Sequence, residues 1–137
     1  MLNGRCLCGR VRYEADAEIR AIVHCHCETC RRTHASAFSS VASIPRKSFR
    51  WVAGEELLKN FESSPGKFRY FCSACGSHLM AERPVTDNVL LRLGCLDTPI
   101  KPETAMHIWR SDASSWYDPK EQLPEVAEGY VAAKQLT

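Results

Sequence analysis

The chain has 137 residues, of which 45% are hydrophobic and 25% are charged, a composition typical of globular domains. Its 18 basic and 16 acidic residues leave a net charge of +2, which argues against nucleic-acid binding driven by charge. The sequence has no apolar run of about 18 residues, so no membrane-spanning helix is predicted. The first residues carry no apolar stretch typical of a signal peptide, and we expect a cytoplasmic protein.

This length predicts a single domain over residues 1–137. Its core is expected to cover about residues 3–125, and no element is predicted for 126–137. The chain from residue 111 onward has no clean periodicity, and we expect it to pack over a sheet.

Short alternating segments separated by turn residues predict a mostly β protein, with the regular strand spacing of a sandwich or barrel. Strands are expected over residues 11–15, 21–23, 38–44, 49–52, 67–71, 88–93 and 106–109. Residues 57–61 fit either a helical turn or a strand, and residues 63–66 form a strong turn signal. Residues 28–34 are the best candidate for a short helix.

Seven of the eight cysteines lie in three tight clusters. The clusters are Cys6 with Cys8, then Cys25, Cys27 and Cys30, and finally Cys72 with Cys75. In a reducing compartment, such close spacings are more typical of metal ligands than of disulfides.

The first and last clusters together predict a closed metal site formed by Cys6, Cys8, Cys72 and Cys75. Four thiolates suit tetrahedral zinc, and a four-thiolate iron centre is the alternative metal. On an extended segment the first two cysteines would share a face, and Gly76 would end a tight turn in the left-handed region. Because the site would join distant parts of the chain, metal binding should stabilise the fold strongly. Four buried free cysteines are the alternative.

The middle cluster supplies three thiolates, from Cys25, Cys27 and Cys30. Zinc with three protein ligands keeps a position for water or substrate. Three thiolates make the metal a poor acidifier of water but suit it to ionise an incoming thiol, and the thiolate is the reactive form. The alternative is a fourth protein ligand, for which the candidates are His24, His26, His34, His78, His107 and Cys95. Cys95 has apolar neighbours and fits a buried core cysteine better.

Three residues that follow the middle cluster are candidates for substrate contacts. Arg31 and Arg32 would point about 100° apart on a helix, so that one could face the metal site and hold a carboxylate. His34 would share the helix face of Cys30 and could relay a proton or bind substrate. The alternative is a solvated basic pair and an ordinary polar histidine.

These motifs together resemble the glutathione-dependent formaldehyde-activating enzyme (GFA) family. The resemblance rests on residues 4–14, 24–32, 37–38, 63–67, 71–77, 93–97 and 107–109. It implies a zinc-stabilised β-tent fold, with short antiparallel sheets and one short helix near the second cysteine cluster. The chain departs from the family at Ala35, where glycine is common, and at Cys95, where threonine or serine is common.

The resemblance further implies two zinc ions per chain. One would be structural, at Cys6, Cys8, Cys72 and Cys75, and the other catalytic, at Cys25, Cys27 and Cys30. The implied activity is that of a carbon–sulfur lyase that reversibly joins glutathione and formaldehyde as S-hydroxymethylglutathione, with the glutathione thiol in the open position of the second zinc.

Two other functions compete with this enzyme hypothesis. A non-catalytic zinc-stabilised binding module would have a closed or empty second site and an exposed apolar patch. A zinc-ribbon nucleic-acid binder is disfavoured by the near-neutral charge and by the Cys-x-Cys spacing. The expected partners are therefore a small thiol such as glutathione and an aldehyde, with no nucleic acid and no membrane. Pairing of exposed edge strands would allow a homodimer.

Overall fold

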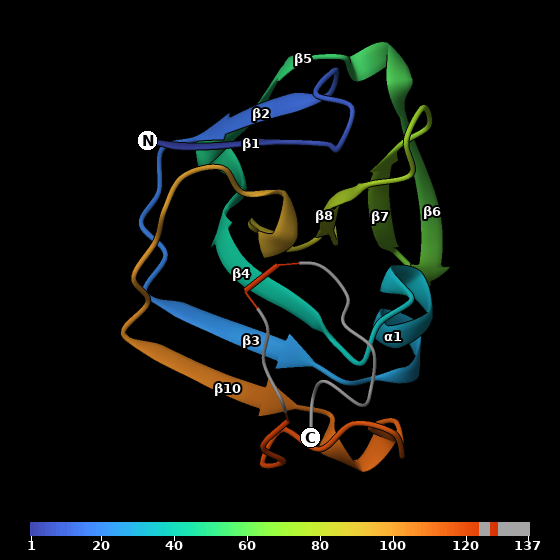
Figure 1. Cartoon of the computed structure of the whole chain (residues 1–137). Helices are drawn as coiled ribbons and strands as arrows, with labels where there is room; N and C mark the ends of the chain where they lie inside the picture. Colours follow the sequence, from blue (N-terminus) through green and yellow to red (C-terminus); the bar gives the residue numbers. More distant parts are fainter. Residues whose placement is uncertain (124–126, 129–137) are drawn as a thin grey trace.

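Two β-sheets and one short α-helix make up the part of the protein that the structure describes (Figure 1). The computed structural model describes residues 1–123 and 127–128, so most of the segment 126–137, for which no element was predicted, lies outside the described residues. The three-stranded sheet has the order β1 (Leu2–Arg5), β2 (Arg12–Ala15), β5 (Phe49–Ala53). The seven-stranded sheet has the order β10 (Thr104–Ile108), β3 (Ala21–Cys25), β4 (Ser39–Pro45), β9 (Asn88–Arg92), β8 (His78–Glu82), β7 (Lys67–Cys72), β6 (Leu58–Ser64).

The prediction of a mostly β fold is confirmed, with one difference in strand direction. Neighbouring strands are antiparallel except β10 and β3, which are parallel. In this parallel pair His107 lies opposite His24, and Ile108 lies opposite Cys25. The return of β10 therefore places late residues of the chain beside the second cysteine cluster.

All seven predicted strands are present, and two further strands were missed. In β1, the ring of Tyr13 packs over Gly4 and lies 2.2 Å from where a Cβ would be, so no larger side chain fits at this position. This interrupts the apolar–polar alternation that a sequence reading needs. In β8, all residues from Leu79 to Glu82 are buried, so the strand has no exposed face to alternate with. The ambiguous residues 57–61 combine both alternatives, because a 3₁₀ turn (Glu55–Leu57) runs into β6.

Helix α1 (Glu28–His34) has the predicted bounds. The Cys27 side chain caps its N-terminus by accepting the N–H of Cys30 at 3.3 Å, and Arg32 pairs with Glu28 one turn away at 2.8 Å. Ala35 ends the helix in the left-handed region at φ 47°, where glycine is usually preferred because it has no Cβ. The cap thus ties the geometry of the helix to a cysteine of the second cluster.

The hydrophobic core lies against the first cysteine cluster. Its largest fully buried side chains include Tyr13, Ile44, Leu79, Met80 and Leu91. Cys6 and Cys72 belong to the same buried group. The first cluster is therefore continuous with the packing that holds the two sheets together.

Across the residues that the structure describes, no helix combines the length and the apolar character needed to cross a membrane.

Candidate functional site

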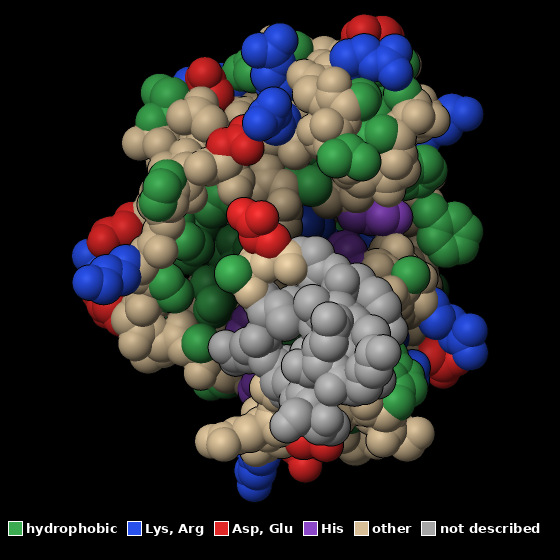
Figure 2. All heavy atoms as spheres, viewed as in Figure 1, with side chains coloured by type: hydrophobic (Ala, Val, Ile, Leu, Met, Phe, Trp, Pro, Cys, Tyr) green, Lys and Arg blue, Asp and Glu red, His purple; other side chains and the backbone are tan. Residues whose placement is uncertain are grey.

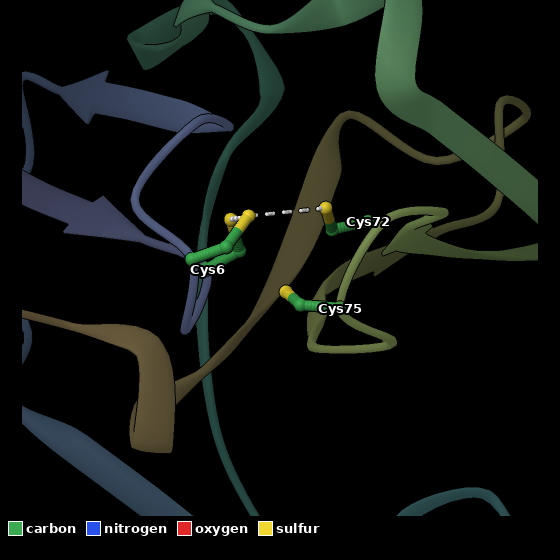
Figure 3. Close-up of side chains that lie close together, drawn as sticks. Cys6, Cys72 and Cys75 are labelled. Carbon is green, nitrogen blue, oxygen red and sulfur yellow. Dashed lines mark hydrogen bonds between the residues drawn. The ribbon is translucent and has the colours of Figure 1, made fainter.

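The first cysteine cluster brings together four sulfurs from two distant turns (Figure 3). The sulfurs of Cys6, Cys8, Cys72 and Cys75 all lie within 4.8 Å of one another. Cys6 and Cys8 were expected on an extended strand, but residues 7–9 form a turn in which the Gly9 N–H donates to the Cys6 carbonyl at 3.0 Å. The turn still leaves the two sulfurs 3.4 Å apart. These four residues can hold a tetrahedral metal ion.

The second half of this cluster is a tight turn of the expected kind. The Gly76 N–H donates to the Cys72 carbonyl at 2.7 Å, and Gly76 has the predicted left-handed backbone, at φ 77°. Hydrogen bonds from the Ser77 side chain, the Cys8 amide and the Ser77 amide lower the pKa of Cys75 to about 5. Ser77 also accepts the Leu7 N–H at 2.9 Å, which joins the two turns. The site is thus organised to present at least one thiolate.

The second cluster contains Cys25, Cys27 and Cys30, whose sulfurs also lie within 4.8 Å of one another. Cys25 ends β3, Cys27 caps α1 and Cys30 lies in the first turn of that helix. Cys25 and Cys30 are buried, whereas Cys27 is partly exposed. One sulfur therefore faces solvent while the other two anchor the group within the protein.

The three thiols of this cluster differ in their electrostatic surroundings. Burial raises the pKa of Cys25 to about 12. Burial also opposes ionisation of Cys30, but hydrogen bonding from Ser39, Cys27 and Cys25, together with the charge of Arg69, outweighs burial and brings its pKa to about 7. Arg69 is itself buried, and its Nη1 lies 3.9 Å from the Cys30 sulfur. The surroundings therefore favour a negative charge on this cluster.

The candidate fourth ligands do not join this group. Within the described part of the chain, no histidine nitrogen, carboxylate oxygen or further sulfur completes a four-membered set with Cys25, Cys27 and Cys30. Cys95 instead donates its thiol to the His78 carbonyl at 3.3 Å. His26 is fully buried and its Nε2 lies 2.7 Å from Nδ1 of His107. The donor set is therefore three thiols, which fits a metal that keeps one position for another ligand.

A cavity of about 420 Å³ adjoins the partly exposed Cys27. Its lining is Cys27, Glu28, Thr29, Ser63, Ser64, Lys67, Arg69, Arg83, Trp109 and Asp112. Lys67 and Arg69 come from β7, and Arg83 follows β8. Burial, followed by the charges of Arg69 and Arg92, lowers the pKa of Lys67, which indicates a concentration of positive charge at this wall. The cavity can therefore receive an anionic molecule next to the thiols.

The predicted substrate contacts Arg31, Arg32 and His34 occupy other places. Arg31 donates its Nε to the backbone carbonyls of His26 at 3.3 Å and Asp112 at 3.1 Å, which ties α1 to the chain after β10. The exposed Arg32 pairs with Glu28. His34 lines a different cavity, described below. Their roles toward a substrate remain predictions.

The sequence profile of the family described as "Glutathione-dependent formaldehyde-activating enzyme" matches residues 1–112. This chain belongs to the GFA family.

Curated relatives of this GFA chain share modest identity with it. An uncharacterized lyase of Schizosaccharomyces pombe is 34% identical over 77 residues, which are 56% of this chain and 54% of the relative. A Colletotrichum graminicola protein, provisionally named as a glutathione-dependent formaldehyde-activating enzyme, is 30% identical over 98 residues, which are 70% of this chain and 44% of the relative. The GFA chain thus matches about half the length of these relatives.

A solved structure shares the fold of the GFA chain. The crystal structure of a Rhodobacter sphaeroides protein has a TM-score of 0.59 and 23% identity, and it covers 76% of this chain and 98% of the other.

Sequence reasoning missed the basic residues of this GFA chain that line the cavity. Lys67, Arg69 and Arg83 lie far from Cys27 in sequence, and only the tertiary fold, in which β7 pairs with β8, brings them to its cavity. Arg69 carried one usable signal, since it is a charged residue that lies between Phe68 and Tyr70 within a predicted strand.

Proposed function

We propose that this chain is a carbon–sulfur lyase that reversibly joins a thiol and an aldehyde, with glutathione and formaldehyde as its substrates and S-hydroxymethylglutathione as the adduct. The observation that carries the proposal is the group of three thiols, Cys25, Cys27 and Cys30, open to a cavity with a basic wall. Family membership supports the reaction class, as do the names of two relatives, one called a lyase and the other a glutathione-dependent formaldehyde-activating enzyme.

The two cysteine clusters would hold zinc in different roles. Cys6, Cys8, Cys72 and Cys75 would hold a structural ion, because four thiols from two turns satisfy tetrahedral zinc. Cys25, Cys27 and Cys30 would hold a catalytic ion. When bound at the second cluster, zinc supplies a Lewis acid that ionises a thiol at neutral pH.

Residues of the chain itself would select and position the thiol. Glutathione carries two carboxylates, and Lys67, Arg69 and Arg83 place positive charge along one side of the cavity. Arg83 is held in place by donating to the Pro65 carbonyl at 2.7 Å and to the Ser64 hydroxyl at 3.2 Å. Ionic contacts with the peptide would orient its sulfur toward Cys27, which is the partly exposed cysteine of the cluster.

The proposed reaction needs no oxidant or reductant. The substrate thiolate attacks the aldehyde carbon, a carbon–sulfur bond forms, and the π electrons of the carbonyl move to oxygen, which takes a proton from solvent. The reverse reaction breaks the same bond and returns the aldehyde. The positive charge of Arg69 beside the buried cluster would stabilise the negative charge that gathers there.

The test is an exchange experiment on the zinc-loaded chain. Glutathione and ¹³C-formaldehyde reach equilibrium with their adduct, and exchange NMR measures the interconversion rate. We expect a rate above that of the buffer alone that rises in proportion to protein concentration, and we expect Cys27→Ser to remove the increase. Cys95→Ser is the matched control, because its sulfur lies outside both clusters. An exchange rate independent of protein would reject the lyase proposal and favour the zinc-stabilised binding module.

A further inference from the structure

A second cavity, of about 370 Å³, lies between α1 and the middle of the seven-stranded sheet. Its lining comes from three adjacent strands, β4, β9 and β8, from the end of the helix and from the segments next to these elements. The residues that matter here are Ser39 and Ser40 of β4, His78 of β8, Arg92 of β9 and His34 of α1. None of them belongs to the basic cavity beside Cys27.

Three buried nitrogen atoms of this lining have no hydrogen-bond partner among the residues that the structure describes. They are Nη2 of Arg92, Nε2 of His34 and Nδ1 of His78. Arg92 is only 4% exposed, so its guanidinium cannot be solvated as it would be at the surface. A buried polar nitrogen without a hydrogen-bond partner is costly, which indicates that something else meets these atoms when the protein is at work.

The charge of the lining limits what that partner can be. The cavity has no acidic residue in its described lining, and Arg92 is its one permanently charged group. Burial, followed by the charge of Arg92, lowers the pKa of His78 as well as that of His34, so both rings are neutral at neutral pH. A partner with one negative charge would match the single guanidinium of this lining.

We infer that this cavity is a binding site for a small carboxylate, held by the Arg92 guanidinium with the rings of His34 and His78 beside it. A planar guanidinium matches a carboxylate with two parallel hydrogen bonds. The two imidazole rings lie with their centroids 5.3 Å apart, edge to face, so both border the same space. The cavity volume is near the lower end for ligand sites, which are about 300–1,000 Å³, and suits an acid of few heavy atoms.

The position of the cavity connects it to the second cysteine cluster. Ser39 lines the cavity and also favours ionisation of Cys30, and His34 follows Cys30 by one helical turn. Figure 2 shows histidine side chains beside a recess in this face of the molecule, with a basic side chain visible deep within it. A bound carboxylate would therefore lie near the second cysteine cluster, in a cavity whose lining does not include Lys67 or Arg83.

Two kinds of molecule could supply the carboxylate that binds in this cavity. It could belong to a separate small acid, or it could be a carboxylate of the peptide thiol of the proposed reaction. The contacts of Arg92, His34 and His78 support either source, and the inference does not depend on lyase activity.

The test is a titration of the zinc-loaded full chain with sodium acetate, with sodium chloride keeping the ionic strength constant. The ring signals of His34 and His78 are followed in long-range ¹H–¹⁵N spectra and assigned with His34→Asn and His78→Asn. Acetamide, which has the same shape without the charge, is the matched probe and needs no variant. We expect saturable shifts of both rings with acetate and none with acetamide. Absence of saturation, or equal shifts with both probes, would overturn the inference.

Arg92→Lys tests the anchor, because it keeps the charge but loses the paired donors. We expect acetate affinity to fall by about tenfold or more in a variant whose backbone spectrum remains native. Unchanged affinity would overturn the site, since acetate would then bind elsewhere, for example at the cysteine cluster. Arg20→Gln, at an exposed arginine paired with Glu18, controls for general charge effects.

S-methylglutathione then separates the two sources in the wild-type chain. Displacement of acetate by this peptide would assign the cavity to a carboxylate of the thiol substrate. Simultaneous binding of both would assign it to a separate small acid. Acetate binding without lyase exchange would leave this site standing while the proposed function fails, so the two failures are distinguishable.

Discussion

The guanidinium of Arg69 lies 3.9 Å from the sulfur of Cys30, and both residues are buried. Arg69 is held there by the bond from its Nε to the Ser63 hydroxyl, at 2.8 Å. A strand of the sheet thus brings a fixed positive charge to a helix cysteine 39 positions away in sequence. Together with the hydrogen bonds from Ser39, Cys27 and Cys25, this charge lowers the pKa of the buried Cys30 thiol.

Replacing this charge should raise the pKa of Cys30. Metal binding to a cysteine cluster releases protons, so its pH midpoint follows the thiol pKa. We expect Arg69→Met to move the midpoint for cobalt uptake at the second cluster upward, by about one pH unit. Arg69→Lys should move it less. The midpoint is measured from the sulfur-to-cobalt charge-transfer absorbance as a function of pH. An unchanged midpoint in Arg69→Met would show that Arg69 does not act on Cys30.

The two cysteine clusters should contribute unequally to stability. Metal in the first cluster links Cys8 to Cys72, which are 64 positions apart, and a cross-link over such a loop contributes about 4 kcal/mol. We expect Cys72→Ser to lower the melting temperature by about 15 °C. Cys27→Ser should lower it much less, because Cys27 is partly exposed and lies outside the core, yet it should abolish activity. Differential scanning calorimetry of both zinc-loaded variants checks this, and equal losses would make the second cluster a structural site.

Local motifs made the grouping of the thiols and helix α1 predictable, whereas the pairing of distant strands determined the other site residues. Cys25, Cys27 and Cys30 lie within six positions of one another, so their spacing alone indicated a shared metal ion and the start of a helix. Arg69 and Arg92 could not be assigned in this way, because they lie on β7 and β9, far from the second cluster in sequence, and only the folded sheet brings Arg69 beside Cys30. The expected role of Arg31 and Arg32 rested on sequence proximity to the cluster, and the structure gives these side chains partners on α1 and on nearby backbone.

The basic cavity should favour thiols that carry carboxylates. We expect Lys67→Gln to raise KM for glutathione about five- to tenfold, because it removes a partly buried charge from the wall. The same variant should leave KM for 2-mercaptoethanol, which has no carboxylate, within about twofold. Lys59→Gln is the control, since this lysine is exposed on β6 and does not line the cavity. Equal effects of Lys67→Gln on both thiols would mean that the lysine acts on the reaction rather than on recognition.

The stability of the fold should fall in mild acid because of His34. Burial of its ring, with the charges of Arg92, His78 and Arg69, lowers its pKa to about 3, whereas an unfolded histidine titrates near 6.5. Below about pH 6.5 the unfolded chain therefore binds a proton that the folded chain does not. The stabilisation from neutral His34 is complete above that pH and is lost as the pH falls toward 3.

Urea denaturation of wild type and His34→Asn at pH 7.5 and 5.5 measures this contribution. Between pH 7.5 and 5.5 we expect the unfolding free energy of the wild type to fall by about 1 kcal/mol more than that of the variant. This figure allows for the partial solvent access of the ring. Acid also protonates the metal-binding thiols, but it does so in both proteins, so the difference between them isolates the histidine. Equal losses would show that His34 can accept a proton within the folded protein, which would contradict the burial that places it beside Arg92.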